Sequence, residues 1–209
     1  MKSKHKEILS TVSDYYTNRV QEFGETPQGV DWNGEAGQVI RFEQLMKVVD
    51  RENPFTIIDL GCGYGAMYEW MGENYQDFSY LGIDISQDMV SSASRLYGQN
   101  SNFEVACSEN LESQADYLVA SGIFNVKLGQ PESDWKQYIL DTLESMNNAT
   151  HKGFSFNCLT SYSDADKMRP DLHYANSLEL FDFCKTNYSR NVALLHDYEL
   201  YEFTILVKK

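Results

Sequence analysis

Hydrophobic positions in the first part of the chain recur at helical spacing. Over 8–23, apolar residues return every three or four positions, which predicts an amphipathic helix. The segment 24–37 is rich in glycine and polar residues and predicts a turn-rich loop with an exposed Trp32. A second helix is expected after it, with apolar residues on one face up to Val49. Residues 1–50 are therefore expected to form a separate helical segment.

From residue 55 onward, short apolar runs alternate with segments of helical length. The runs that predict strands are 55–60, 79–85, 102–107, 115–122, 153–160, 192–197 and 200–207. Strands separated by helices form a parallel sheet through right-handed crossovers. The last two runs are separated by only two residues, which is too short for a crossover and predicts an antiparallel hairpin.

The expected fold is α/β, a three-layer α/β/α sandwich. Its mostly parallel seven-stranded sheet would end in the C-terminal antiparallel hairpin, and residues 51–209 would form one compact unit. The hydrophobic fraction of 42% supports a real core in a chain of 209 residues.

Composition excludes several classes of partner. Lys and Arg number 17 against 31 Asp and Glu, a net charge of −14, and such an acidic surface repels nucleic acid. No apolar run approaches the ~20 residues that span a bilayer. The N-terminus also lacks the apolar region of a secretory signal, so a cytoplasmic location with no membrane partner is expected. The widely spaced cysteines Cys62, Cys107, Cys158 and Cys184 predict neither a zinc site nor a disulfide framework.

The strongest chemical signal is Asp59-Leu-Gly61-Cys-Gly63-Tyr-Gly65, which follows the strand over 55–60. Glycines allow positive φ and a close approach of ligand to backbone, and the next helix offers free N–H groups. Asp84 ends the next strand, where a carboxylate can accept hydrogen bonds from both hydroxyls of a ribose. A dinucleotide site would show G-x-G-x-x-G, whereas the spacing here is G-x-G-x-G, which disfavours NAD.

Four segments in order, IIDLGCGYG (57–65), YLGIDIS (80–86), FEVACSENL (103–111) and DYLVASGIFN (116–125), resemble the nucleoside-binding motifs of a known family. That family is the class I S-adenosylmethionine-dependent methyltransferases, of the small-molecule type with an N-terminal helical lid. The resemblance implies that residues 1–50 form this lid and contribute to acceptor binding. The resemblance covers about 55–209, includes the closing hairpin, and implies S-adenosyl-L-methionine as the cofactor.

The resemblance also implies a role for each matching residue. The methionine part of the cofactor would be surrounded by Asp59, Gly61, Cys62, Gly63 and Gly65, and the ribose would be held by Asp84. The adenine would pack on Ile85 and Met89, and its edge would be contacted by Cys107, Ser108 and Glu109. Ser121 would lie beside the sulfonium. At Cys107 the family's usual Asp is replaced.

Acceptor residues are expected at the carboxyl ends of the strands, where open α/β sheets bind ligands. The candidates are Tyr16, Arg19, Trp32, Asn125, Arg169 and Tyr174, with Arg19 or Arg41 as candidates for the cofactor carboxylate. His173 is the candidate general base because histidine titrates near neutrality. No metal is expected, since Asp116 lies at the wrong end of its strand for a metal-dependent site.

The expected function is methylation of a small polar metabolite on oxygen or nitrogen. The cationic and aromatic residues in the acceptor segments suggest a carboxylate or phosphate on that metabolite. The alternatives are a protein methyltransferase, a non-catalytic S-adenosylmethionine- or nucleoside-binding protein and, more weakly, a nicotinamide-dependent oxidoreductase. The lid is expected to order around the cofactor, with the loop of Trp32 as its hinge. The acceptor, the pathway and the oligomeric state stay open.

Overall fold

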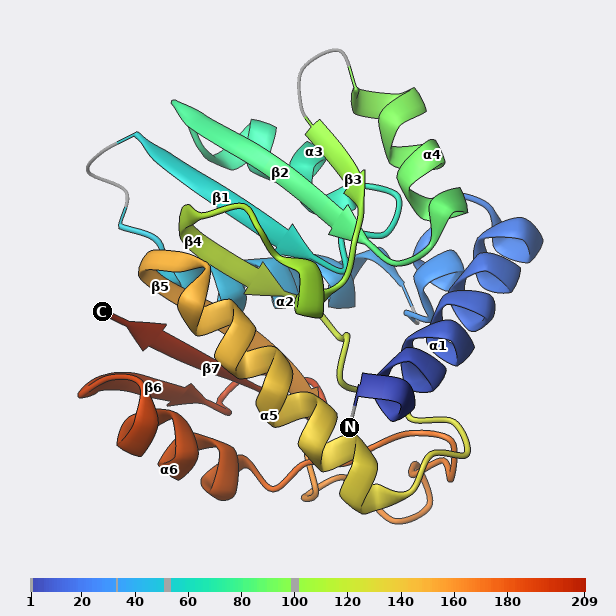
Figure 1. Cartoon of the computed structure of the whole chain (residues 1–209), viewed down its shortest axis with the longest axis vertical. Coiled ribbons are helices and arrows are strands. Elements are labelled where there is room, and N and C mark those ends of the chain that lie inside the picture. The colour runs from blue at the N-terminus through green and yellow to red at the C-terminus, as the bar shows by residue number, and fades with distance from the viewer. Residues whose placement is uncertain (1, 33, 51–53, 99–101) are drawn as a thin grey trace.

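The computed structural model describes residues 2–32, 34–50, 54–98 and 102–209, and Figure 1 shows their arrangement. The seven strands form one sheet in the order β3-β2-β1-β4-β5-β7-β6. Their bounds are β1 Phe55–Leu60, β2 Phe78–Asp84, β3 Asn102–Val105, β4 Ala115–Ala120, β5 Thr150–Leu159, β6 Asn191–Leu195 and β7 Glu202–Lys208. β7 lies between β5 and β6 and runs antiparallel to both, whereas β1 to β5 pair in parallel. The predicted α/β fold with its closing hairpin is confirmed.

Helices cover both faces of the sheet and the carboxyl ends of its central strands. Their bounds are α1 Lys2–Phe23, α2 Glu35–Leu45, α3 Ala66–Asn74, α4 Gln87–Tyr97, α5 Glu132–Asn148 and α6 Ser177–Asn187, with the 3-10 helices η1 Pro27–Val30, η2 Met46–Val48 and η3 Ser108–Asn110. In Figure 1, α1 lies beyond the arrowheads of β1, β2 and β4, which places it over the end of the sheet where a ligand would bind.

Two hydrophobic cores lie on opposite faces of the sheet, because neighbouring residues of a strand point to opposite sides. Ile57 packs in one core with Phe42 of α2 and Met67 of α3. Ile58 packs in the other with Trp135 of α5 and Phe156 of β5. The continuous apolar run of β1 is therefore explained by burial on both faces.

The first fifty residues divide between two positions. α1 and η1 lie at the strand ends, whereas α2 packs against a face of the sheet, where the backbone carbonyl of Leu45 accepts a 2.9 Å hydrogen bond from the Ser155 hydroxyl. Within the expected loop, η1 begins with Pro27 after Thr26, whose side chain accepts a hydrogen bond from the Gly29 amide. The expected domain boundary after residue 50 adjoins 51–53, which lie outside the described residues.

The closing hairpin has a longer connection than its sequence predicts. Its antiparallel pairing is confirmed, but it stops at Leu195 opposite Thr204, so residues 196–201 form the connection. Tyr198 in this connection folds back, and its hydroxyl lies 2.9 Å from the Thr204 hydroxyl oxygen. The Leu200 amide donates a 2.8 Å hydrogen bond to the Tyr198 carbonyl, which turns the chain before β7 begins.

Removing an aromatic side chain from the core that contains Ile58 tests the packing of that face of the sheet. Phe156 is 0% exposed, so Phe156→Ala should lower the free energy of unfolding by about 3–5 kcal/mol, through lost burial and the cavity left behind. Urea unfolding followed by circular dichroism measures this change. Leu178→Ala is the control, because Leu178 is 58% exposed and a surface change should stay within about 0.5 kcal/mol. Equal effects in the two variants would contradict the assignment of the core.

Candidate functional site

A cavity with about 900 Å³ of empty space, part of it open to solvent, lies at the carboxyl ends of β1, β2 and β4. Most residues that the sequence assigns to the cofactor line it, namely Asp59, Gly61, Cys62, Gly63, Asp84, Ile85, Met89, Cys107, Ser108 and Ser121. Two of the acceptor candidates, Tyr16 and Trp32, line it as well. The cavity therefore collects side chains from the N-terminal segment and from the ends of four strands, β3 included.

The glycine turn forms one wall of the cavity with bare backbone. Gly61 and Gly63 have φ values of 81° and 54°, in the left-handed region that favours glycine. A Cβ on Gly61 would lie 2.2 Å from a methyl carbon of Ile123, and one on Gly63 would lie 2.9 Å from a methyl carbon of Val30. Side chains at these positions would therefore push against the opposite walls. Gly65 is the N-cap of α3 and does not line the cavity.

Asp84 is held by backbone amides on both sides. One carboxylate oxygen accepts a 2.9 Å hydrogen bond from the Gly63 amide, and the other accepts one of the same length from the Ser86 amide. Burial raises the pKa of Asp84, and the hydrogen bonds from backbone amides oppose that rise. Each carboxylate oxygen can accept more than one hydrogen bond, so both stay able to bind hydroxyl groups of a ligand.

Asp59 has one satisfied and one unsatisfied oxygen. Its Oδ2 accepts a 2.7 Å hydrogen bond from the Tyr80 hydroxyl. Oδ1 is buried without a hydrogen-bond partner, and so is the hydroxyl oxygen of Ser121. Burial raises the pKa of Asp59 to about 7, with the Tyr80 hydrogen bond opposing the rise and the Asp84 charge adding to it. Buried polar atoms without partners are costly, so these two indicate a ligand group that donates hydrogen bonds.

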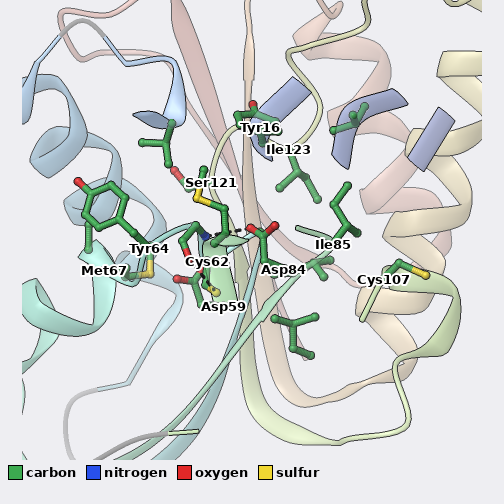
Figure 2. A pocket seen from close by; sticks show the side chains of 18 of the residues that line it. Tyr16, Asp59, Cys62, Tyr64, Met67, Asp84, Ile85, Cys107, Ser121 and Ile123 are labelled. Carbon is green, nitrogen blue, oxygen red and sulfur yellow. Dashed lines mark hydrogen bonds between the residues drawn. The ribbon is translucent and has the colours of Figure 1, made fainter. Parts of the chain in front are cut away.

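The two carboxylates lie between two groups of lining side chains. Figure 2 shows Asp59 and Asp84 at the centre of the view, Cys107 on one side of them, and Tyr64 and Met67 on the other. The side near Cys107 is apolar and includes Ile85. An apolar slot there suits a flat ring, whereas the glycine turn and Asp59 suit a polar, charged group.

Trp32 is packed rather than exposed, contrary to expectation. The guanidinium carbon of Arg41 lies 3.8 Å from the centre of its ring. On its other side, a Cβ on Gly122 would fall only 2.4 Å from ring carbons of Trp32. The indole therefore lies between α2 and the end of β4, and it helps to close the cavity together with Tyr16 of α1. Burial raises the pKa of Tyr16, which keeps its hydroxyl protonated.

The remaining predicted residues do not line the cavity, and these are Gly65, Glu109, Arg19, Asn125, Arg169, Tyr174 and His173. Glu109 pairs instead with His5 of α1, at 3.0 Å. Arg19 lies 3.3 Å from Asp31, and Arg169 lies 2.5 Å from Asp171. Carboxylates therefore partner the arginines that the sequence offers for an anionic acceptor.

Arg41, a candidate for binding the cofactor carboxylate, is paired with a carboxylate of the protein itself. Its guanidinium makes three hydrogen bonds of 2.6–3.0 Å to the carboxylate of Glu202 in β7. This partner has no local signature in the sequence.

His173 lies behind the cavity wall. Its Nδ1 is 2.8 Å from a carboxylate oxygen of Glu132, and its backbone amide donates a 2.8 Å hydrogen bond to the Asn125 carbonyl. Burial lowers the pKa of His173, and the Glu132 carboxylate opposes that change. Asn125 holds β5 through its side-chain oxygen, which accepts a 2.9 Å hydrogen bond from the Leu159 amide. Catalysis by His173 therefore stays a prediction without support from this geometry.

Several cavity residues escape the sequence argument. Tyr64 lies between the predicted glycines, and its hydroxyl donates a 3.4 Å hydrogen bond to Gln38 of α2. Its place inside the glycine motif is a signal that could have revealed it. Gln38 and Phe42 share a face of α2, but nothing in their spacing indicates that this face meets the cavity. Tyr80 is recognisable only from its contact with Asp59.

The described residues offer neither a cluster of metal ligands nor a membrane-spanning helix. Over 2–32, 34–50, 54–98 and 102–209, no group of three or more His, Cys, Asp or Glu side chains could hold a metal ion. In the same ranges, no helix has both the length and the apolar character to cross a membrane.

Comparisons with known proteins point to one family. A family model described as a methyltransferase domain matches residues 57–162. The Mycobacterium tuberculosis protein Rv1506c, a methyltransferase by name, is 51% identical over 164 residues, which are 78% of this chain and 99% of that protein. Magnesium protoporphyrin IX methyltransferase from Synechocystis with bound SAH has a TM-score of 0.70 at 13% identity, over 96% of this chain and 99% of its own. Human N-acetylserotonin methyltransferase in complex with SAM has a TM-score of 0.68 at 13% identity, over 97% of this chain and 59% of its own.

The buried carboxyl of Asp59 should make stability depend on pH. Because burial raises its folded-state pKa from 3.8 to about 7, the protonated form is favoured on folding. This contribution is complete below the unfolded pKa and is lost as the pH rises through the folded pKa. The free energy of unfolding should therefore fall between about pH 4 and pH 7 relative to Asp59→Asn. Denaturant unfolding of both proteins across this range measures the difference.

Tyr80→Phe is the matched variant for this test. It removes the hydrogen bond that stabilises the Asp59 carboxylate, so the decline should continue to higher pH. A difference between the wild-type protein and Asp59→Asn that is constant from about pH 4 to pH 8 would contradict the environment described for Asp59.

Proposed function

Because this chain belongs to the class I S-adenosylmethionine-dependent methyltransferase family, we propose that it methylates a small polar acceptor on oxygen or nitrogen. The observation that carries the proposal is one cavity in which the buried carboxylate of Asp84 adjoins a bare glycine turn beneath α1 and Trp32. The acceptor class is inferred from the enclosure of this cavity.

The residues present fit the ribose, the adenine and the ammonium group of the cofactor. The Asp84 carboxylate can accept hydrogen bonds from ribose hydroxyls, and Ile85 and Met89 offer apolar surface to the adenine. The unpartnered oxygens of Asp59 and Ser121 can accept hydrogen bonds from the ammonium of the methionine part. When bound, S-adenosylmethionine supplies an electrophilic methyl group on a positively charged sulfur.

The chain contributes mainly placement and exclusion of water. Methyl transfer is an in-line displacement, so holding donor and acceptor in line supplies much of the rate enhancement. Trp32 and Tyr16 close the cavity toward the N-terminal segment. Where this partly enclosed cavity excludes water, the attraction between its carboxylates and a cationic ligand is stronger.

Enclosure also favours a small acceptor over a protein. A protein substrate needs an open groove for an extended segment, whereas α1 lies over the strand ends here (Figure 1). The arginines Arg19 and Arg169 are already paired with carboxylates. The proposal therefore rests on a polar acceptor and does not require a negative charge on it.

Asp84→Asn should weaken binding of S-adenosylmethionine and of its demethylated product by about tenfold to a hundredfold, because hydrogen bonds to a charged group contribute about 1.5–3 kcal/mol. Calorimetric titration with both compounds and with NAD measures this. Asp77→Asn is the matched control, since Asp77 precedes β2 at the end opposite Asp84. Binding of NAD alone would overturn the cofactor assignment.

Transfer of a labelled methyl group distinguishes the acceptor classes. Wild-type protein with methyl-labelled S-adenosylmethionine and a cell extract should label the low-mass ultrafiltrate, and Asp84→Asn should lose most of that label. Label in the protein fraction would instead support a protein methyltransferase. Cofactor binding without label in either fraction would support a non-catalytic binding protein.

A further inference from the structure

Trp32 is held between two separate parts of the molecule. On one side its ring stacks on the guanidinium of Arg41, at 3.8 Å. On the other side it touches Gly122, the second residue after β4, whose φ of 77° and missing Cβ leave the ring its space. The side-chain nitrogen of Asn125 lies beside the same place, 3.6 Å from where a Cβ on Gly122 would be, and it is buried without a partner. The indole therefore borders a spot that offers a free hydrogen-bond donor.

A buried network connects the two sides. Arg41 and Glu202 are 8% and 1% exposed, and three hydrogen bonds join them. Glu202 also accepts a 2.6 Å hydrogen bond from the side-chain nitrogen of Asn157. The side-chain oxygen of Asn157 accepts a 2.7 Å hydrogen bond from the Gly122 amide. The contacts thus close a ring from Trp32 through Arg41, Glu202, Asn157 and Gly122 back to Trp32.

The chemistry of arginine suits this arrangement. Its guanidinium edge can bind a carboxylate while its flat face stacks on an indole, and an ammonium cannot do both. A buried ion pair is a weak source of net stability, because desolvation offsets much of the attraction. The ion pair is better explained by its position, because it fixes the loop that carries Trp32 against the end of β4.

We propose that Arg41, Glu202 and Asn157 are positioning residues that hold Trp32 against Gly122 as a wall of the cavity. The function of this wall rests on the proposed methyl transfer, but the position of Trp32 can be tested without it. With the wall in place, the acceptor is limited to molecules that fit beside the indole.

Fluorine NMR of protein labelled with 5-fluorotryptophan tests the placement. The chain has three tryptophans, and Trp32→Phe assigns the resonance of Trp32. Arg41→Lys keeps the charge toward Glu202 but loses the stacked face, so the Trp32 resonance should shift and broaden while those of Trp70 and Trp135 stay unchanged.

Arg95→Lys is the matched control for that experiment. Arg95 makes an exposed ion pair with Glu25, which precedes η1 near the same loop. The Trp32 resonance should stay in place in this variant. An unchanged resonance in Arg41→Lys, or an equal shift in Arg95→Lys, would overturn the proposal.

A second measurement leaves the buried ion pair intact, in case Arg41→Lys fails to fold. Trp32→Leu should speed hydrogen exchange of the Gly122 amide by about tenfold or more, because the indole covers it. The Gly61 amide, which donates a 2.7 Å hydrogen bond to Ile83, should keep its wild-type rate. Unchanged exchange at Gly122 would overturn the proposal.

Cofactor affinity separates this proposal from the proposed function. Failure of the wild-type protein to bind S-adenosylhomocysteine would overturn the methyltransferase site, while the fluorine and exchange results would still decide the placement of Trp32. Where binding occurs, Trp32→Leu and Arg41→Lys should each weaken it several-fold, and the double variant should be no weaker than the single ones. Fully additive losses of affinity would contradict the proposal that Arg41 acts through Trp32.

Discussion

The carboxylate of Asp84 is the contact on which the site depends. It accepts hydrogen bonds from the Gly63 amide in the turn after β1 and from the Ser86 amide at the start of α4. A buried carboxylate is tolerated only with such donors. Two turns at neighbouring strand ends are thereby fixed to one side chain, and their backbones form the cavity wall. The residue that is proposed to bind the ribose therefore also builds the site.

Features that follow from local physics could be predicted from the sequence. The apolar run of β1, the helix capped by Ser86 and the G-x-G-x-G turn each depend on neighbouring residues, so pattern and spacing reveal them. Asp59 and Asp84 could be placed because they end adjacent parallel strands, and the ends of such strands meet at one edge of a sheet.

Contacts between distant segments could not be predicted. Arg41 and Glu202 are 161 positions apart, and a charged residue on a helix usually lies in water. Arg19 and Arg169 looked available for an anion, but both lie beside Asp31, which is distant from Arg169 in the sequence. Arg169 is also paired with its near neighbour Asp171. Spacing reveals which face of an element a residue occupies but not which partner that face meets. Trp32 looked exposed for this reason.

The charges around the cavity favour one kind of ligand pair. Among the described residues that line it, two are aspartates and none is Lys, Arg or His. In a chamber of low effective dielectric these carboxylates attract a cationic ligand and repel an anionic one. A sulfonium cofactor suits this field, whereas a carboxylate or phosphate on the acceptor would need a cation that the lining lacks. In the proposed function, acceptor recognition then depends on fit beside Trp32. The acceptor group proposed on this ground is an uncharged hydroxyl or amine.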